Sequence, residues 1–147
     1  MRKIPFELKP YPTLRDSPKP VLPVTFKNLR DENKIFQSIC LIDSGADYCT
    51  LPLSAGYTLD PDFDKLGAGK NFIQYACENR NFFGYLYKLL VVVLDARREP
   101  LEMPLTVNFV NSETIPVVGR NFMDRFGKIS YITKEQKGFF EDVKKEE

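Results

Sequence analysis

The residues best suited to chemistry lie at the end of an apolar segment. Residues 39–42 are apolar and mostly β-forming, and Asp43, Ser44 and Gly45 follow at once. Such a run predicts a buried strand, and a glycine directly after it permits a tight turn. A carboxylate at the end of this strand is presented rigidly at a surface or an interface, because burial without partners would be unfavourable. An ordinary turn would also use these three residue types.

The absence of histidine narrows the chemistry available to the chain. It removes Ser-His and Cys-His nucleophile pairs, imidazole bases and most catalytic zinc sites. Cys40, Cys49 and Cys77 lack the spacing of a metal-binding knuckle, and residues 67–70 lack the spacing of a phosphate-binding loop. Carboxylate chemistry is therefore the leading possibility for an enzyme, and we expect neither a metal nor an organic cofactor.

The sequence contains two separate blocks, Leu41-Ile42-Asp43-Ser44-Gly45-Ala46-Asp47 and Ile115-Pro116-Val117-Val118-Gly119-Arg120-Asn121. In this order they resemble the two signature blocks of the retropepsin-like aspartic proteases. The family's first block is apolar-apolar-Asp-Thr/Ser-Gly-Ala, often followed by a second aspartate. Its second block is apolar-apolar-Gly-Arg-Asp/Asn, which opens a short helix. The resemblance covers roughly residues 21–131 and is closest to small soluble prokaryotic members.

The resemblance implies an aspartic-type endopeptidase with Asp43, Ser44 and Gly45 at its catalytic centre. Aspartic proteolysis needs two carboxylates about 3 Å apart that share one proton, of which one activates a water and the other protonates the scissile carbonyl. Asp43 lies in the only Asp-Xaa-Gly of the chain, so a C2 homodimer must supply the second carboxylate. Ser44 would hydrogen-bond across the dimer axis, and Gly45 would let the backbone approach the substrate.

Four further residues receive roles by the same resemblance. Ala46 and Asp47 would line the groove and meet the main chain of the substrate. Gly119 and Arg120 would support the site, with Arg120 pairing with Asp47 through a charge-assisted bond. The groove would hold an extended peptide by strand-like hydrogen bonds.

A hairpin that closes over the substrate, the flap, belongs between the two blocks. Two placements compete: the glycines of residues 67–69, and the polar turn 76–81 between two aromatic, strand-forming segments. We favour 76–81, although its lack of glycine departs from the family and predicts a stiffer tip. Substrate-binding residues on this flap would be Ala76, Cys77, Glu78 and Asn79.

The predicted fold is mainly β: a single retropepsin-like (acid protease) β-barrel domain with one short C-terminal helix. The sequence divides into a proline-rich arm (1–20), the protease domain (21–133) and a charged tail (134–147). The arm would be extended, with an edge strand near 5–8, and residues 54–70 would be loop. Strands are predicted at 24–27, 35–42, 48–53, 71–75, 82–94, 101–110, 115–118 and 128–133, and a helix over 119–125.

The composition bears on the partners and the cellular location of the protein. The net charge of +1, with acids and bases intermingled, gives no reason to expect nucleic acid or an anionic membrane as a partner. The odd cysteine count and the lack of an apolar leader predict a cytoplasmic protein. We therefore expect a homodimer that acts on a peptide or protein substrate.

Two other interpretations stay open at this stage. The same dimeric fold could serve as a peptide-binding or dimerisation module with weak or no catalysis, which the glycine-poor flap favours. The chain could also be an unrelated small β protein with a chance Asp-Ser-Gly. Dimerisation separates this last interpretation from the other two, and dependence of cleavage on Asp43 separates the enzyme from the module.

Overall fold

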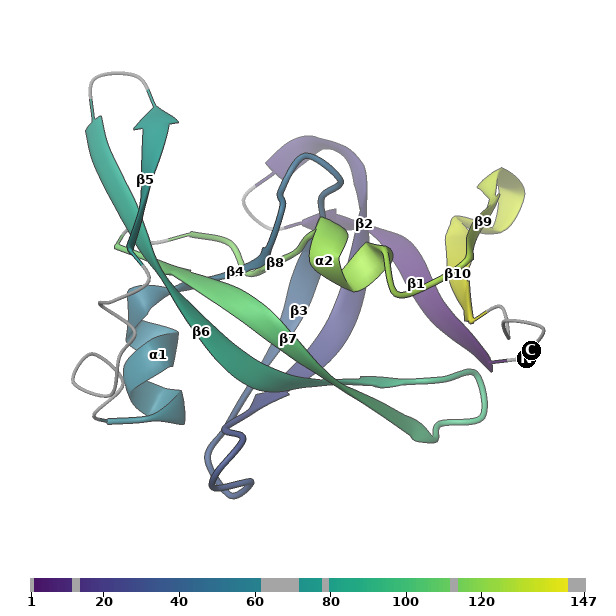
Figure 1. The fold of residues 1–147 in the computed structure, drawn as a ribbon. Helices are drawn as coiled ribbons and strands as arrows, with labels where there is room; N and C mark the ends of the chain where they lie inside the picture. The colour runs from purple at the N-terminus through teal and green to yellow at the C-terminus, as the bar shows by residue number, and fades with distance from the viewer. Residues whose placement is uncertain (1, 12–13, 62–71, 78–79, 112–113, 143–147) are drawn as a thin grey trace.

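The computed structural model describes residues 2–11, 14–61, 72–77, 80–111 and 114–142. The described strands form one ten-stranded sheet in the order β5-β6-β7-β4-β8-β3-β2-β1-β10-β9 (Figure 1). Strand β6 also pairs with β2, so the sheet returns on itself through β6, β7, β4, β8, β3 and β2. The elements are β1 (Arg2–Tyr11), β2 (Leu14–Lys27), β3 (Ile35–Ile42), β4 (Cys49–Pro52), α1 (Leu53–Leu59), β5 (Phe72–Cys77), β6 (Arg80–Leu94), β7 (Pro100–Val110), β8 (Val117–Val118), α2 (Arg120–Met123), β9 (Lys128–Ile132), a 3-10 turn η2 (Thr133–Glu135) and β10 (Lys137–Asp142).

The strands around the Asp-Ser-Gly turn follow the prediction closely. β3 spans Ile35–Ile42, as the sequence indicated, and it pairs antiparallel with β2 and parallel with the short strand β8. β4 resumes after the turn and lies between β8 and β7. The two blocks that carry the family resemblance therefore meet in one part of the sheet, although they lie far apart in the sequence.

The N-terminal segment contains the strand predicted near 5–8, but as the longer β1, which lies between β2 and β10 and not at the edge of the sheet. β1 and β2 form a hairpin, β1 pairs with β10, and β2 pairs with both β3 and β6. Arg2 Nε donates to Asp95 Oδ2 at 3.2 Å, and Ala96 N–H donates to the Lys3 carbonyl at 2.8 Å. The prolines misled the prediction, because a proline removes only its own backbone donor and is tolerated where a strand does not need that donor.

The C-terminal segment also differs from the predicted solvated tail. β10 pairs with β1 and β9, and the Phe140 ring is fully buried. Its centroid lies 5.0 Å from that of Phe6, on β1, and 5.4 Å from those of Phe122 and Phe126. Aromatic contacts at these distances stabilise beyond the area they bury. The two ends of the chain thus pack against α2, the helix opened by the second block.

The helices correct two further expectations. Residues 54–70 were expected to be loop, but α1 spans Leu53–Leu59 and buries Ala55 and Leu59. Helix α2 is shorter than the predicted 119–125, since only Arg120–Met123 is helical and turns follow. In the described residues no helix has both the length and the apolar character needed to cross a membrane.

The hairpin expected between the two blocks is present in the backbone. β5 pairs antiparallel with β6 from Phe72↔Tyr85 to Cys77↔Arg80. The strands therefore extend into the predicted turn 76–81, and residues 78–79 lie outside the described residues. Residues 67–69, the competing placement of the flap, lie outside them too. In Figure 1 this hairpin projects upward on the same side of the molecule as the turn between β3 and β4.

A continuous apolar core lies beneath these elements. It takes buried side chains from both ends of the chain, from the strands beside the Asp-Ser-Gly turn and from both helices. The largest fully buried side chains are Phe26, Phe109, Phe122, Phe140, Ile4, Leu22, Leu51, Leu59, Leu89, Val91 and Val93.

Candidate active site

The Asp43 carboxylate is held in a defined position by its own turn. The ladder between β3 and β8 continues past the strand, because Asp43 N–H donates to the Val118 carbonyl at 3.0 Å. Asp43 Oδ1 accepts the backbone N–H of Gly45 at 2.8 Å, and the Ala46 N–H donates to the Asp43 carbonyl at 3.2 Å. These bonds fix the side chain locally, as in an Asx turn. Within the described part of the chain, Oδ2 has no hydrogen bond and is available to a partner.

The three predicted catalytic residues are all exposed in the single chain. Asp43, Ser44 and Gly45 have high solvent accessibility, and the Ser44 hydroxyl makes no hydrogen bond to any described residue. A Cβ added at Gly45 would lie 3.1 Å from Asp43 Oδ1, a tight contact. Glycine therefore suits the close approach of the backbone amide to this carboxylate.

Helix α2 supports the turn mainly through its backbone. The Arg120 N–H donates to the Ala46 carbonyl at 2.7 Å, and the Asn121 N–H donates to the Asp47 carbonyl at 3.1 Å. Gly119 allows this close approach, since a Cβ there would overlap the Tyr48 carbonyl and lie 2.7 Å from Ala46 O. The second block is thus packed directly on the first.

The predicted pair between Arg120 and Asp47 is present but loose. Arg120 Nη1 lies 3.9 Å from Asp47 Oδ1, and the two side chains are 58% and 80% exposed. Exposed pairs of this kind contribute little because water and salt screen them. The pair gives the turn much less support than the backbone bonds do.

Asn121 ties the site together, and the sequence analysis gave it no role. Its Oδ1 accepts the Cys49 N–H at 3.0 Å, and its Nδ2 donates to the Thr106 carbonyl at 2.7 Å. One side chain thus joins α2 to β4 and β7. The signal was available, because Asn121 is the last residue of the second block.

Thiol chemistry has no support at this site. Cys40 and Cys49 flank the turn but are fully buried. Burial raises the pKa of the Cys49 thiol to about 11 and raises the pKa of Cys40 further, with the nearby Cys49 adding to that shift. A thiol that stays protonated is neither a nucleophile nor a metal ligand.

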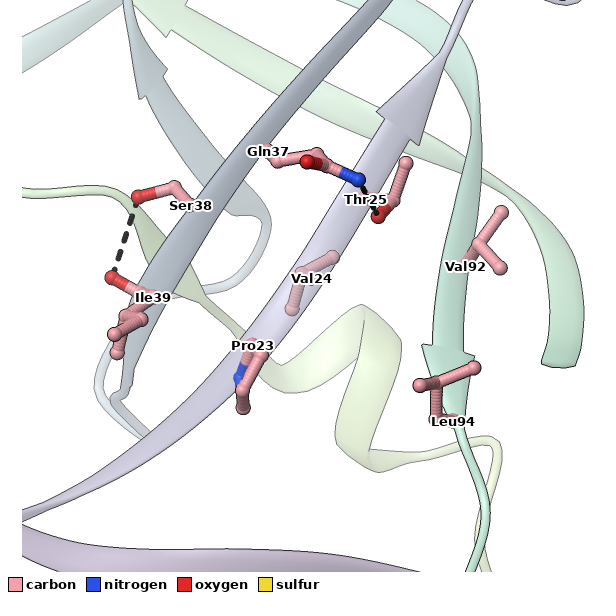
Figure 2. A pocket seen from close by; sticks show the side chains of 8 residues that line it. All are labelled: Pro23, Val24, Thr25, Gln37, Ser38, Ile39, Val92 and Leu94. Atoms are coloured by element: carbon pink, nitrogen blue, oxygen red, sulfur yellow. Dashed lines mark hydrogen bonds between the residues drawn. The ribbon is translucent and has the colours of Figure 1, made fainter. Parts of the chain in front are cut away.

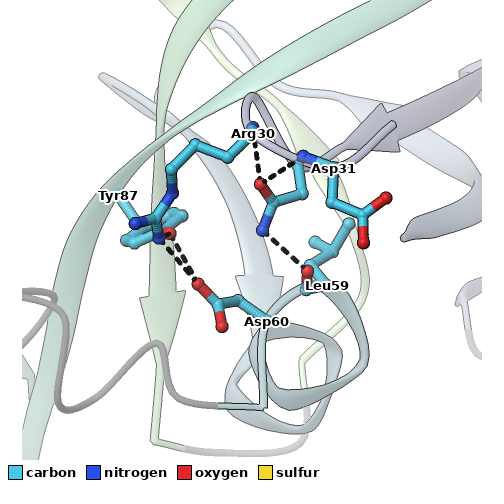
Figure 3. Close-up of polar contacts among 6 residues, drawn as sticks. Arg30, Asp31, Leu59, Asp60 and Tyr87 are labelled. Atoms are coloured by element: carbon cyan, nitrogen blue, oxygen red, sulfur yellow. Dashed lines mark hydrogen bonds and ion pairs between the residues drawn. The ribbon is translucent and has the colours of Figure 1, made fainter. Parts of the chain in front are cut away.

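A separate polar cluster joins α1 to β6 (Figure 3). The buried Asp60 carboxylate accepts hydrogen bonds from the Tyr87 hydroxyl at 2.9 Å and from Arg30 Nη2 at 3.1 Å. Asn28 donates to the Leu59 carbonyl at 3.0 Å and accepts the backbone N–H groups of Arg30 and Asp31. Burial, together with the bond to Asp60, raises the pKa of Tyr87. These groups satisfy one another and stabilise the fold.

An open hollow on the β2, β3 and β6 surface is a poor candidate for catalysis (Figure 2). Its polar side chains include Thr25 and Gln37, which hydrogen-bond to each other at 3.2 Å. It has no acid or base, so it lacks the groups that proton transfer requires. The lining residues are Pro23, Val24, Thr25, Gln37, Ser38, Ile39, Val92 and Leu94.

The arrangement as a whole can be compared with known structures. It is similar to the crystal structure of a retropepsin-like aspartic protease from Rickettsia conorii, with a TM-score of 0.54 and 13% sequence identity. The match covers 94% of this chain and 89% of that one. The likeness is one of fold. No family model and no curated protein sequence matches the chain.

The retropepsin-like fold brings most of the predicted site residues into one region. Residues 43–47 form a single turn that rests on Gly119 and Arg120. Ala76 and Cys77 end β5, at the far end of the hairpin, and Glu78 and Asn79 lie outside the described residues. The mainly β architecture is as predicted, while the roles of the individual residues stay predictions.

Proposed function

We propose that this chain is an aspartic endopeptidase that acts as a homodimer. The observation that carries the proposal is the exposed Asp43 carboxylate, with one oxygen fixed by the Gly45 N–H and the other unpaired within the described residues. A second copy of the chain, related by a two-fold axis, would bring its own Asp43 alongside. The two carboxylates would share a proton, because like charges so close cannot both ionise.

Each group then has a defined task. The ionised carboxylate takes a proton from a water held between the two copies, and the resulting hydroxide attacks the peptide carbonyl carbon. The protonated carboxylate donates its proton to the carbonyl oxygen as the C–O double bond opens. The first carboxyl then donates its newly acquired proton to the leaving nitrogen, and the C–N bond breaks. The second carboxylate takes a proton from a hydroxyl of the tetrahedral diol as the C–O double bond forms again, so one shared proton remains on the pair. Ser44 would hold the two turns together across the axis.

Exposed apolar side chains beside Ser44 support a dimer in this orientation. Ile129 and Tyr131, on the edge strand β9, are 47% and 48% exposed. A shallow hollow places them next to Ser44 and Met123. Covering these side chains with a second copy would remove apolar surface from water, which favours association.

The β5–β6 hairpin is the proposed flap, and the groove beneath it would hold an extended peptide. The peptide main chain would bind by strand-like hydrogen bonds near Ala46 and Asp47 and under residues 76–79. The partners we propose are thus a second copy and a peptide or protein substrate, and a cytoplasmic location remains a prediction.

Cleavage by wild type and by Asp43→Asn tests the proposal. Each protein would be incubated with a diverse peptide mixture from about pH 4 to about pH 7.5, and the products sequenced by mass spectrometry. We expect wild type to cut and Asp43→Asn to lose at least about a thousandfold in rate. If a folded, dimeric wild type cuts nothing, the peptide-binding module becomes the better account. The absence of glycine from residues 76–81 is the observation that favours this second candidate.

A further inference from the structure

The side chain of Asn108, on β7, is fully buried and makes no hydrogen bond to the described residues. This holds for both its Nδ2 and its Oδ1. An asparagine amide can donate two hydrogen bonds and accept two, and leaving these groups unmet in a protein interior is unfavourable. Buried polar groups in folded proteins are nearly always paired, so an unpaired amide needs an explanation.

The register of the sheet relates Asn108 to the candidate active site. Asn108 pairs with Thr50 on β4, Thr50 pairs with Val117 on β8, and Val117 pairs with Leu41 on β3. Paired residues on neighbouring strands point to the same face of a sheet. Asp43 comes two residues after Leu41 and continues the ladder to β8, so it belongs to the same face. Asn108 is therefore part of a lateral row that ends beside Asp43.

The other residues of this row are partly exposed. Leu41, Thr50 and Val117 are half-buried, whereas their sequence neighbours Cys40, Leu51 and Val118 point into the core and are fully buried. Of the four residues in this row, Asn108 is the one whose side-chain polar atoms are buried and make no hydrogen bond to the described residues. Thr50, by contrast, donates its hydroxyl to the Tyr48 carbonyl at 3.1 Å.

The amide contacts a strand of the proposed flap. A Cβ added at Gly84 of β6 would overlap the Asn108 side chain, so the amide packs directly on the Gly84 backbone. Gly84 pairs with Ile73 on one side and with Val110 on the other, which places it where the hairpin leaves the main sheet. A hairpin that shifts to admit a peptide would uncover the amide at this point.

We propose that Asn108 determines specificity by forming the polar floor of a subsite for an asparagine or glutamine side chain of the bound peptide. This inference rests on the proposed function for the location of the groove. A carboxamide supplies an acceptor and a donor together, so it can pair with both atoms of the Asn108 amide. A carboxylate would satisfy only the donor and would bury a charge, and an aliphatic side chain would leave both atoms unmet.

Peptide capture tests this assignment without depending on catalysis. Asp43→Asn would be incubated with a mixture of randomised decapeptides, and the retained peptides sequenced. We expect asparagine and glutamine to be enriched at one position by at least about tenfold, because sites built for a hydrogen bond reject ligands that lack it. In Asp43→Asn/Asn108→Leu the enrichment should pass to aliphatic side chains. Asn108→Val serves as a second replacement if leucine does not fit, and the exposed, remote Asn33→Leu serves as a control that should not change the profile.

The outcomes separate this inference from the proposed function. Capture that depends on Asn108, together with a wild type that does not cut, would support the inference and overturn the peptidase proposal. Cleavage by wild type with the same preference in Asn108→Leu would overturn the inference alone. A profile without asparagine or glutamine preference would also overturn it. If the folded protein neither captures nor cuts any peptide, both are contradicted.

Discussion

Asn28 and Asn108 are two buried asparagines in opposite situations. Asn28 is 3% exposed, and its amide makes three hydrogen bonds, to Leu59, Arg30 and Asp31. Asn108 is 0% exposed, and its amide makes none to the described residues. Burial alone therefore does not show whether an amide is paired. The difference lies in whether the fold itself provides the partners, because an amide that the fold leaves unpaired lowers stability unless a ligand uses it.

Replacing Asn28 should produce the largest change in stability. Asn28→Ala removes three hydrogen bonds, one buried at the Leu59 carbonyl and two partly buried at the Arg30 and Asp31 N–H groups, so we expect the free energy of unfolding to fall by about 3 kcal/mol. Urea unfolding at a fixed protein concentration measures this, since a dimer's stability depends on concentration. A loss below about 0.5 kcal/mol would show that water replaces the amide and that the contrast with Asn108 is weaker than described.

Replacing Asn108 should change stability in the opposite direction. Asn108→Leu removes an unpaired amide at similar volume, and we expect the free energy of unfolding to rise by about 1–2 kcal/mol. The same urea titration applies, with Asn108→Val as the variant that avoids overpacking. Destabilisation by both variants would mean that Asn108 has a structural role, and the comparison with Asn28 would fail.

Tyr87→Phe tests the cluster around Asp60 with a smaller change. The variant keeps the ring, whose centroid lies 6.3 Å from that of Phe109, and removes only the hydroxyl that donates to Asp60. We expect a loss of about 1 kcal/mol near neutral pH. Thermal unfolding of the variant beside wild type is the measurement, and an unchanged midpoint would indicate that the Asp60 carboxylate is satisfied without the Tyr87 hydroxyl.

The dependence of the unfolding free energy on alkaline pH should show the smallest and most specific effect. The pKa of Tyr87 is raised in the folded protein by burial and by its bond to Asp60. Its contribution to stability is therefore fully present below the unfolded pKa, about 10, and is lost as the pH rises through the higher folded value. Stability of wild type should fall more steeply above about pH 10 than that of Tyr87→Phe. Parallel curves would contradict the assigned shift.

The local sequence pattern predicted the elements that are bounded by recognisable turn residues. β3 has the predicted bounds because a polar turn precedes it and the Asp-Ser-Gly turn ends it. The two strands of the hairpin are β-rich on both sides of a short polar segment, and they pair as expected. The start of α2 was visible as Gly119-Arg120, where glycine permits the close approach to the Tyr48 carbonyl.

The missed elements depend on partners that are distant in sequence. β1 and β10 form because they pair with each other and bury Phe6 against Phe140, which no pattern within either segment reveals. α1 has no side-chain cap and contains a central glycine, so its buried face alone stabilises it. The burial of Asn108 likewise follows from the pairing of β6 with β7.

The most direct test of the account is the activity of mixtures of wild type and Asp43→Asn. If one site needs Asp43 from both copies, a mixed dimer is inactive, and activity at fixed total protein should follow the square of the wild-type fraction. After subunit exchange an equal mixture should retain about one quarter of the wild-type activity, as expected for random pairing in a two-fold dimer. About one half, a linear dependence, would show that each chain carries a complete site, and would contradict a catalytic pair shared across the dimer axis.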